Sequence, residues 1–203
     1  LGAGAEFAPV ADAALAVSYP GKPVPALGLA DLSPLPRVGV KGQRALHWTR
    51  EQGWPVPETS NVAAQTPTGD LVLRLGDREL LVASAPNGDG KEVLALEHVI
   101  PGDGAWPVPR RDSHCAFALQ GDAAVECLAK LCGVDLRPAH FPPGSIAQTS
   151  VARVNAVVCR PPDSDGRTFH LFADSATAIW FWDALLDAMS EFGGGPLGTR
   201  DLA

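Results

Sequence analysis

Short runs of alternating apolar and polar residues predict a first set of strands and helices between residues 37 and 99. A period of two residues is typical of a half-buried strand, whereas apolar residues three and four apart are typical of a helix. Gly53 follows the first helical run and Pro101 follows the second, as expected near helix ends. The pattern predicts strands at 37–41, 70–75 and 79–83, and helices at 43–52 and 91–99.

The same kind of pattern returns after a Pro- and Gly-rich loop at 102–111. Asp122 precedes a helical run and is placed to act as its N-cap, and Gly133 follows that run. The last helical run ends at the three glycines 193–195. The pattern here predicts strands at 114–119, 150–159 and 168–173, and helices at 122–132 and 176–192.

Set side by side, the two sets form a weak internal repeat at an offset of about 80 residues. Residues 38–45 resemble 117–124, and residues 78–84 resemble 167–173. Strands joined by hairpins and interspersed with helices indicate an α+β fold. We therefore expect two pseudo-repeated strand–helix–strand–strand–helix halves with antiparallel sheets. The alternative is chance similarity between turns built from small residues.

The chain before residue 31 is rich in Ala, Gly and Pro and has no sustained period. Its Pro-Gly and Pro-Val-Pro steps favour extended backbone. We expect an N-terminal arm that wraps a neighbouring surface or is disordered when free. The expected organisation is an extended or flexible arm at 1–30, a first α+β half at 31–100, a linker at 101–113, a second half at 114–195 and a tail at 196–203.

The last predicted helix carries the most informative surface feature. Trp180 points roughly 170° away from the middle of the apolar stripe, so its indole is expected on the solvent side. Together with Phe181 it is a candidate anchor for a partner protein. Burial of the indole by another loop of the same chain is the alternative. The stripe expected to face the core consists of Ile179, Trp182, Leu185, Leu186, Met189 and Phe192.

Composition supports a covered surface. Hydrophobic residues make up 46% of the 203 residues, an ordinary share, but charged residues make up only 19%. An average soluble protein has about 25%, so the shortage suggests that a partner chain covers part of the surface. The formal net charge of −7 argues against nucleic-acid binding, which requires a basic face.

The cysteines and the hydropathy profile indicate a cytoplasmic protein. No run of 18 apolar residues predicts a membrane span, and the first 17 residues lack the basic region of a secretory signal. Four cysteines have neither disulfide nor metal-ligand spacing, so we expect buried thiols in a reducing compartment. They are Cys115, Cys127, Cys132 and Cys159.

The sequence contains no motif that assigns a catalytic, cofactor-binding or metal-binding residue. No phosphate-binding loop, zinc-protease motif or nucleophile elbow occurs. Residues 163–166 resemble the start of a calcium loop but lack its later ligands, so a polar turn is expected. The five histidines are scattered. Arg110 and Arg111, in the densest polar cluster, are candidates to bind an anion or a partner carboxylate, or are simply solvated.

Four segments carry a resemblance to a known family: residues 31–42, 135–153, 180–186 and 191–193. They resemble the gamma subunit of heterotetrameric sarcosine oxidase. The block at 135–153 is the most specific of them, and the resemblance covers roughly residues 28–195.

The resemblance implies a complex of alpha, beta, gamma and delta subunits. Such a complex oxidatively demethylates sarcosine to glycine, transfers the one-carbon unit to tetrahydrofolate and produces hydrogen peroxide. In the family, FAD, FMN, NAD and the folate site belong to the alpha and beta subunits, and the delta subunit holds zinc. The gamma subunit is similar in fold to the folate-binding aminomethyltransferases. The implied role of this chain is complex assembly and stability.

Two motifs of the folate enzymes are missing here. Aminomethyltransferases carry an Asn-Asp pair after the first helix, whereas residues 53–61 contain none. The Lys-Gly-Cys-Tyr type of motif of related iron–sulfur-assembly proteins is also absent. No catalytic residue is therefore carried over from the family. The alternatives are a subunit of a complex acting on another N-methylated amine, such as dimethylglycine, and a stand-alone folate-dependent one-carbon transferase.

Overall fold

The computed structural model describes residues 4–10 and 12–202, and their strands and helices alternate along the chain. The strands are β1 Glu6–Val10, β2 Ala13–Ser18, β3 Leu27–Asp31, β4 Arg37–Lys41, β5 Val62–Gln65, β6 Leu71–Gly76, β7 Glu79–Ala83, β8 Trp106–Pro109, β9 His114–Gly121, β10 Ile146–Val151, β11 Val154–Cys159, β12 Thr168–Asp174 and β13 Gly195–Pro196. The helices are α1 Ala45–Glu51, α2 Lys91–Val99, α3 Ala124–Ala129 and α4 Ala178–Met189, with short 3₁₀ turns η1 Ser175–Thr177, η2 Ser190–Phe192 and η3 Thr199–Asp201.

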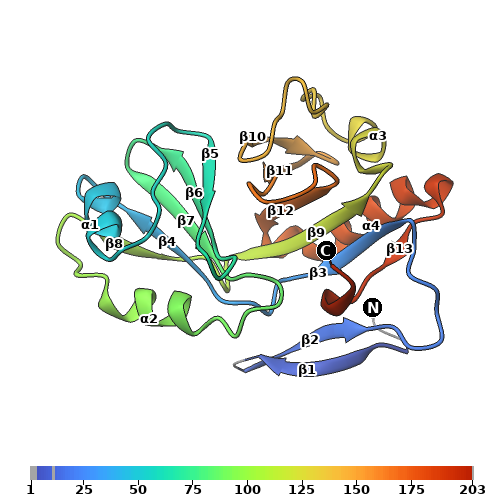
Figure 1. Cartoon of the computed structure of the whole chain (residues 1–203), viewed down its shortest axis with the longest axis horizontal. Helices are drawn as coiled ribbons and strands as arrows, with labels where there is room; N and C mark the ends of the chain where they lie inside the picture. Colours follow the sequence, from blue (N-terminus) through green and yellow to red (C-terminus); the bar gives the residue numbers. More distant parts are fainter. Residues whose placement is uncertain (1–3, 11, 203) are drawn as a thin grey trace.

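Two packed sheets form the body of the molecule (Figure 1). In the described part of the chain, one sheet has the strand order β5-β6-β7-β4-β8 and the other has the order β10-β11-β12-β9-β3-β13. All their pairings are antiparallel except the short pairing of β13 with β3. The mixed α+β class with antiparallel sheets is therefore confirmed.

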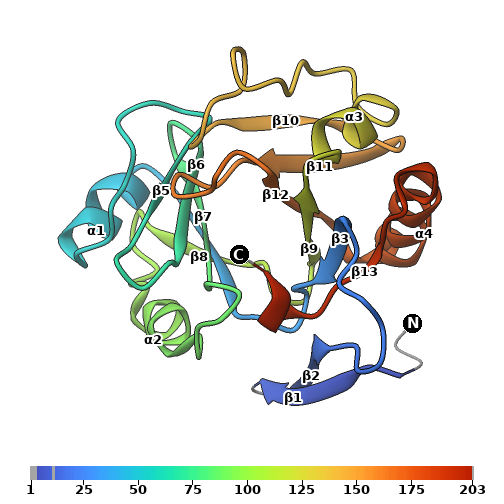
Figure 2. The same cartoon turned by 45° about the vertical axis from the view of Figure 1, so that its right-hand side comes forward.

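Helices cover the outer face of each sheet (Figure 2). On the five-stranded sheet, Trp48 of α1 and Leu96 of α2 share a core with Val40 of β4. On the six-stranded sheet, Phe117 of β9 packs edge-on against Trp182 of α4, with ring centroids 5.3 Å apart. Alternate strand residues point the other way, so the two inner faces meet in a third core. The result is a helix–sheet–sheet–helix arrangement.

The N-terminal segment forms a hairpin of β1 and β2 that packs on its own chain. Leu15 and Val17 are buried in the core between the sheets. Ion pairs of Asp12 with Arg111 and of Glu6 with Arg200 hold the hairpin at its edges. Residues 27–31, which we placed at the end of the arm and the start of the first half, form β3 inside the six-stranded sheet. Residues 1–3 and 11 of the expected arm lie outside the described residues.

Most predicted elements occur within a few residues of their expected positions, but four details differ. The expected strand at 150–159 is the hairpin β10–β11, whose turn is Ala152-Arg153. The expected linker at 101–113 contains the edge strand β8, and β5 had no sequence signal. Asp122 does not cap α3, because its carboxylate pairs with Arg167.

Helix α4 is rotated relative to the stripe that we expected. Phe181 is fully buried, whereas Ile179, which we placed in the core, is 69% exposed. The buried positions follow a spacing of three and four residues that starts at Phe181. This shift moves Ile179 to the solvent side beside Trp180 and leaves Leu186 and Phe192 only partly buried. The buried positions are Phe181, Trp182, Leu185, Ala188 and Met189.

Arg37 joins the two connections by which the chain passes between the sheets. Residues 32–36 lead from β3 to β4, and residues 110–113 lead back from β8 to β9. The Arg37 guanidinium, 2% exposed, donates to the Leu32, Leu35 and Ser33 carbonyls at 2.8–3.1 Å. It also donates to the Arg111 and His114 carbonyls at 3.1 and 2.8 Å. Burial lowers the pKa of Arg37 to about 10, so the side chain stays charged at neutral pH.

We predict that Arg37→Met lowers the free energy of unfolding by at least about 3 kcal/mol, since hydrogen bonds to a charged group contribute roughly 1.5–3 kcal/mol each. Arg44→Met is the control, because Arg44 forms an exposed ion pair with Asp103, which is expected to contribute less than about 1 kcal/mol. Urea denaturation measures both. Equal small losses would show that Arg37 does not hold the connections.

We also predict acid sensitivity from His170. It lies on the inner face of β12, opposite Cys159 and Ala118, and burial lowers its pKa to about 4. In the unfolded chain this histidine has a pKa near 6.5 and binds a proton below that pH. In the folded chain the same histidine stays neutral until the pH approaches 4, so acid favours the unfolded state. Stability therefore falls as the pH drops from about 6.5 towards 4, by roughly 3 kcal/mol in total.

His170→Gln removes this titration. Between pH 7.5 and 4.5, acidification should lower the melting temperature of this variant less than it lowers that of the wild type. The exposed His98 supplies the control, as His98→Gln should keep the wild-type slope. A wild-type slope in His170→Gln would contradict the prediction.

Candidate functional site

Trp180 lies on the outer surface of α4, as the sequence predicted. Its side chain is 62% exposed, and its indole Nε1 donates to the Ala152 carbonyl at 3.2 Å. Ile179 beside it is also exposed. A tryptophan fixed by a hydrogen bond while its ring stays exposed is typical of an interface anchor. The structure therefore keeps Trp180 as a candidate contact for a partner.

Phe181 does not share this role. It has no exposed surface, and its ring lies 5.7 Å from that of Phe117 in the core under α4. The prediction that Phe181 takes part in a partner interface is corrected accordingly. A position next to Trp180 in the sequence points about 100° away on the helix, and here that direction is the core.

Arg110 and Arg111 have partners within the chain. Arg110 pairs with Glu79 and contacts His114, and Arg111 pairs with Asp12 of the hairpin. Their side chains are only 14% and 28% exposed. Both guanidinium groups therefore help to fix the β8–β9 connection against its neighbours.

His114 is held in one neutral form by the same cluster. Arg110 Nη1 lies 2.7 Å from its Nε2 and can only donate, so Nε2 accepts. The other nitrogen, Nδ1, then donates to the Ser113 hydroxyl at 2.8 Å, and that hydroxyl donates to the Pro109 carbonyl. Burial, then Arg110 and Arg37, lowers the pKa of His114. Both ring nitrogens are engaged, which favours a structural role.

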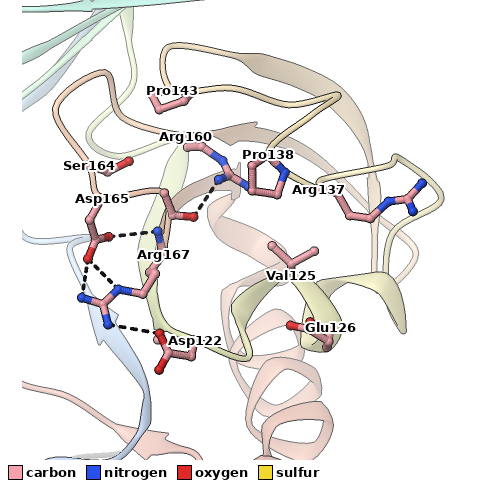
Figure 3. Close-up of a pocket in the computed structure, with 12 residues that line it drawn as sticks. Asp122, Val125, Glu126, Arg137, Pro138, Pro143, Arg160, Ser164, Asp165 and Arg167 are labelled. Atoms are coloured by element: carbon pink, nitrogen blue, oxygen red, sulfur yellow. Dashed lines mark hydrogen bonds and ion pairs between the residues drawn. The ribbon is translucent and has the colours of Figure 1, made fainter.

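A depression of about 530 Å³ near α3 gathers three arginines (Figure 3). Arg167 pairs with Asp122 and Asp165, and Arg137 lies outside them with Asp135 as its partner. The hydrogen bonds from Arg137 hold the pKa of Asp135 well below its usual range. These carboxylates neutralise the guanidinium groups that an anionic ligand would need.

The third arginine, Arg160, serves the chain itself. Its guanidinium donates to the Gly166 and Leu136 carbonyls at 2.7 and 2.5 Å and lies 4.6 Å from the centre of the Phe169 ring. It thereby ties the 161–167 turn and the 133–145 loop to the sheet (Figure 3). The terminal nitrogens of Arg160 thus bind groups of the same chain, which favours a structural role for this depression.

The thiols offer no reactive group. All four cysteines are buried and unpaired. Burial raises the pKa of Cys127 to about 11 and raises that of Cys115 and Cys159 as well, so these thiols stay protonated at neutral pH. Across residues 4–10 and 12–202, no three His, Cys, Asp or Glu side chains gather as a metal site would require.

The turn between β10 and β11 is the most strained backbone near Trp180. Ala152 and Arg153 have φ of 50° and 67°, a left-handed conformation that favours glycine or asparagine. It costs roughly 1–2 kcal/mol per residue for other side chains. The Ala152 amide donates to the Leu131 carbonyl at 3.0 Å, and the Ala152 carbonyl accepts from Trp180, so neighbouring elements hold the turn.

Sequence reasoning missed this turn because it read residues 150–159 as one strand. The signal was the break in alternation at 151–154, where Val, Ala, Arg and Val follow one another.

Within the described part of the chain, no helix is long and apolar enough to cross a membrane.

Comparison with known proteins gives the family. The GCVT N-terminal domain family matches residues 67–202. The aminomethyltransferase of Saccharopolyspora erythraea is 33% identical over 129 residues, which are 63% of this chain and 34% of that protein. The aminomethyltransferase of Geobacillus thermodenitrificans is 35% identical over 138 residues, 64% of this chain and 36% of that one. The chain thus spans about a third of these curated relatives.

Solved structures share the fold. A chain of heterotetrameric sarcosine oxidase from Corynebacterium sp. U-96, in complex with pyrrole 2-carboxylate, superposes with a TM-score of 0.69 at 21% identity, covering 86% of this chain and 89% of that one. Aminomethyltransferase T of the glycine cleavage system from Bartonella henselae gives 0.68 at 18% identity, covering 98% and 57%. The resemblance stated from the sequence is confirmed, and the chain belongs to the GCVT N-terminal domain family.

Proposed function

We propose that this chain is the gamma-type, non-catalytic subunit of a sarcosine oxidase-like heterotetramer. The observation that carries the proposal is the structural match. The chain superposes on a chain of a heterotetrameric sarcosine oxidase with a TM-score of 0.69 and covers 89% of it.

The side-chain geometry supports a structural role. Two arginines of the depression and both arginines of the β8–β9 connection pair with carboxylates of the same chain. Arg160 donates to backbone carbonyls, and His114 has both nitrogens engaged. In this proposal, alpha, beta and delta subunits complete the complex. They hold FAD, FMN, NAD, tetrahydrofolate and zinc, and the demethylation of sarcosine takes place on them, in the cytoplasm. A complex that acts on dimethylglycine is the nearest alternative.

We also propose that the two halves descend from one duplicated unit, with boundaries close to residues 31–100 and 114–195. The supporting observation is the order of elements. The first half runs β4, α1, β5, β6, β7, α2 and the second runs β9, α3, β10, β11, β12, α4. In each half the helices cover the outer face of the sheet.

A second candidate is a folate-dependent one-carbon transferase that works without partners. The identity of 33–35% to two aminomethyltransferases favours it. It requires a tetrahydrofolate site within this chain, whereas the first proposal places that site on a partner.

We predict that the chain assembles stoichiometrically with the other three subunits. Co-expression followed by size-exclusion chromatography with light scattering should give a single peak with one copy of each subunit. The complex should oxidise sarcosine and release peroxide. A chain that elutes alone, while its proposed partners form an active complex without it, would contradict the proposal.

We predict that the isolated chain does not bind tetrahydrofolate. Isothermal titration calorimetry with millimolar tetrahydrofolate should show only heats of dilution. The assembled complex serves as the positive control, as its partner-held site should give a saturable signal. Saturable binding to the isolated chain would support the transferase instead.

A further inference from the structure

A groove of about 720 Å³ runs along the outer side of α4, away from the other sheet. One wall is α4 itself, and the other is formed by the end of α3 and the β10–β11 turn. Its lining residues are Lys130, Leu131, Ala152, Arg153, Trp180, Asp183, Ala184 and Asp187.

The apolar end of the groove is preorganised. Trp180 is 62% exposed, yet its indole is fixed by the hydrogen bond to the Ala152 carbonyl. Ile179 extends the exposed apolar surface in the same helical turn. A fixed aromatic face loses little conformational freedom when it is covered, which favours binding.

The other end of the groove is acidic. Asp183 and Asp187 follow Trp180 three and seven residues along α4, so the indole and both carboxylates share one side of the helix. Both aspartates are exposed. Lys130 forms an ion pair with Glu191 and also interacts electrostatically with Asp187. Arg153 is exposed on the opposite wall, so the three carboxylates of Asp183, Asp187 and Glu191 exceed the two cations by one negative charge.

An indole face beside two carboxylates is the combination that recognises a cationic side chain. The ring quadrupole attracts an ammonium or guanidinium group placed over its face. Carboxylates add charge-assisted hydrogen bonds to the same group. Arginine suits both at once, because its plane stacks on the ring while its edge donates to carboxylates.

The charges disfavour other occupants. An anionic membrane surface or a nucleic acid would meet Asp183 and Asp187 with like charge. A second copy of this chain, with a net charge of −7, would bring its own pair of aspartates to the interface. A small hydrophobic ligand would leave the carboxylates without a counter-charge.

We propose that this groove is the docking site for an arginine or lysine side chain of a partner subunit, which stacks on Trp180 and pairs with Asp183 and Asp187. This inference rests on the proposed function, since it assumes that the chain works within a complex. It adds which surface meets the partner and what chemistry the partner brings.

The test measures association of chain variants with the co-expressed alpha, beta and delta subunits, immobilised for biolayer interferometry. Trp180→Ala should weaken binding at least about tenfold, and the double variant Asp183→Asn/Asp187→Asn at least about threefold. Combining them should weaken binding by less than the product of the two factors, because both act on one cation. Trp106→Ala and Glu92→Gln, exposed residues of the other half, are the matched controls and should bind as the wild type does.

The salt dependence and the stability of the free chain complete the test. The double asparagine variant should lose part of the wild-type decrease in affinity between 50 and 300 mM salt. The melting temperature of the free variants should stay close to that of the wild type. If Trp180→Ala fails to fold, the asparagine variant alone still decides the matter.

Four results would overturn the inference. Variants that assemble as well as the wild type would exclude this groove while leaving the proposed function intact. Multiplicative effects of the two changes would exclude a shared cation. A wild-type chain that does not bind the other subunits at all would refute both proposals, and a free-chain dimer dissolved by Trp180→Ala would assign the groove to a second copy instead.

Discussion

The arrangement of this molecule depends on one buried guanidinium. Arg37 donates five hydrogen bonds to carbonyls of both segments that cross between the sheets. Apolar contacts between the inner faces are not directional, so they favour contact without fixing the angle between the sheets. The planar Arg37 guanidinium, with five carbonyl acceptors at fixed positions, supplies directional contacts that fix the angle between the sheets. The neighbouring contacts of Arg110, Arg111 and the β1–β2 hairpin are built around the same connection.

A rigid body with internally neutralised charges is suited to the role of an assembly subunit. Most of its arginines are committed to carbonyls or carboxylates of the same chain, so the polar clusters stabilise the fold. Along α4, the exposed Trp180 lies beside the exposed carboxylates of Asp183 and Asp187.

Sequence patterns located most strands and helices because period and turn signals are local. The 76–77 hairpin and the helix ending near Gly53 are examples, and the family resemblance was also available from short motifs. Features that depend on tertiary packing could not be predicted from these local patterns. The rotation of α4 that buries Phe181 and exposes Ile179 depends on which neighbours the helix meets. The five carbonyls that accept from Arg37 come from segments up to 77 residues away. Asp122 binds Arg167, 45 residues further along the chain, and therefore does not cap α3.

In the proposed complex, Arg37 fixes the two sheets of the chain before assembly, and α4 then contacts the partner subunit. Amide hydrogen exchange of this chain, free and within the co-expressed complex, tests it most directly. We expect slow exchange at Leu35 and His114 in both states, and protection on assembly only around Trp180 and the Ala152-Arg153 turn. Fast exchange at Leu35 and His114 that slows on assembly, with no change around Trp180, would contradict the account.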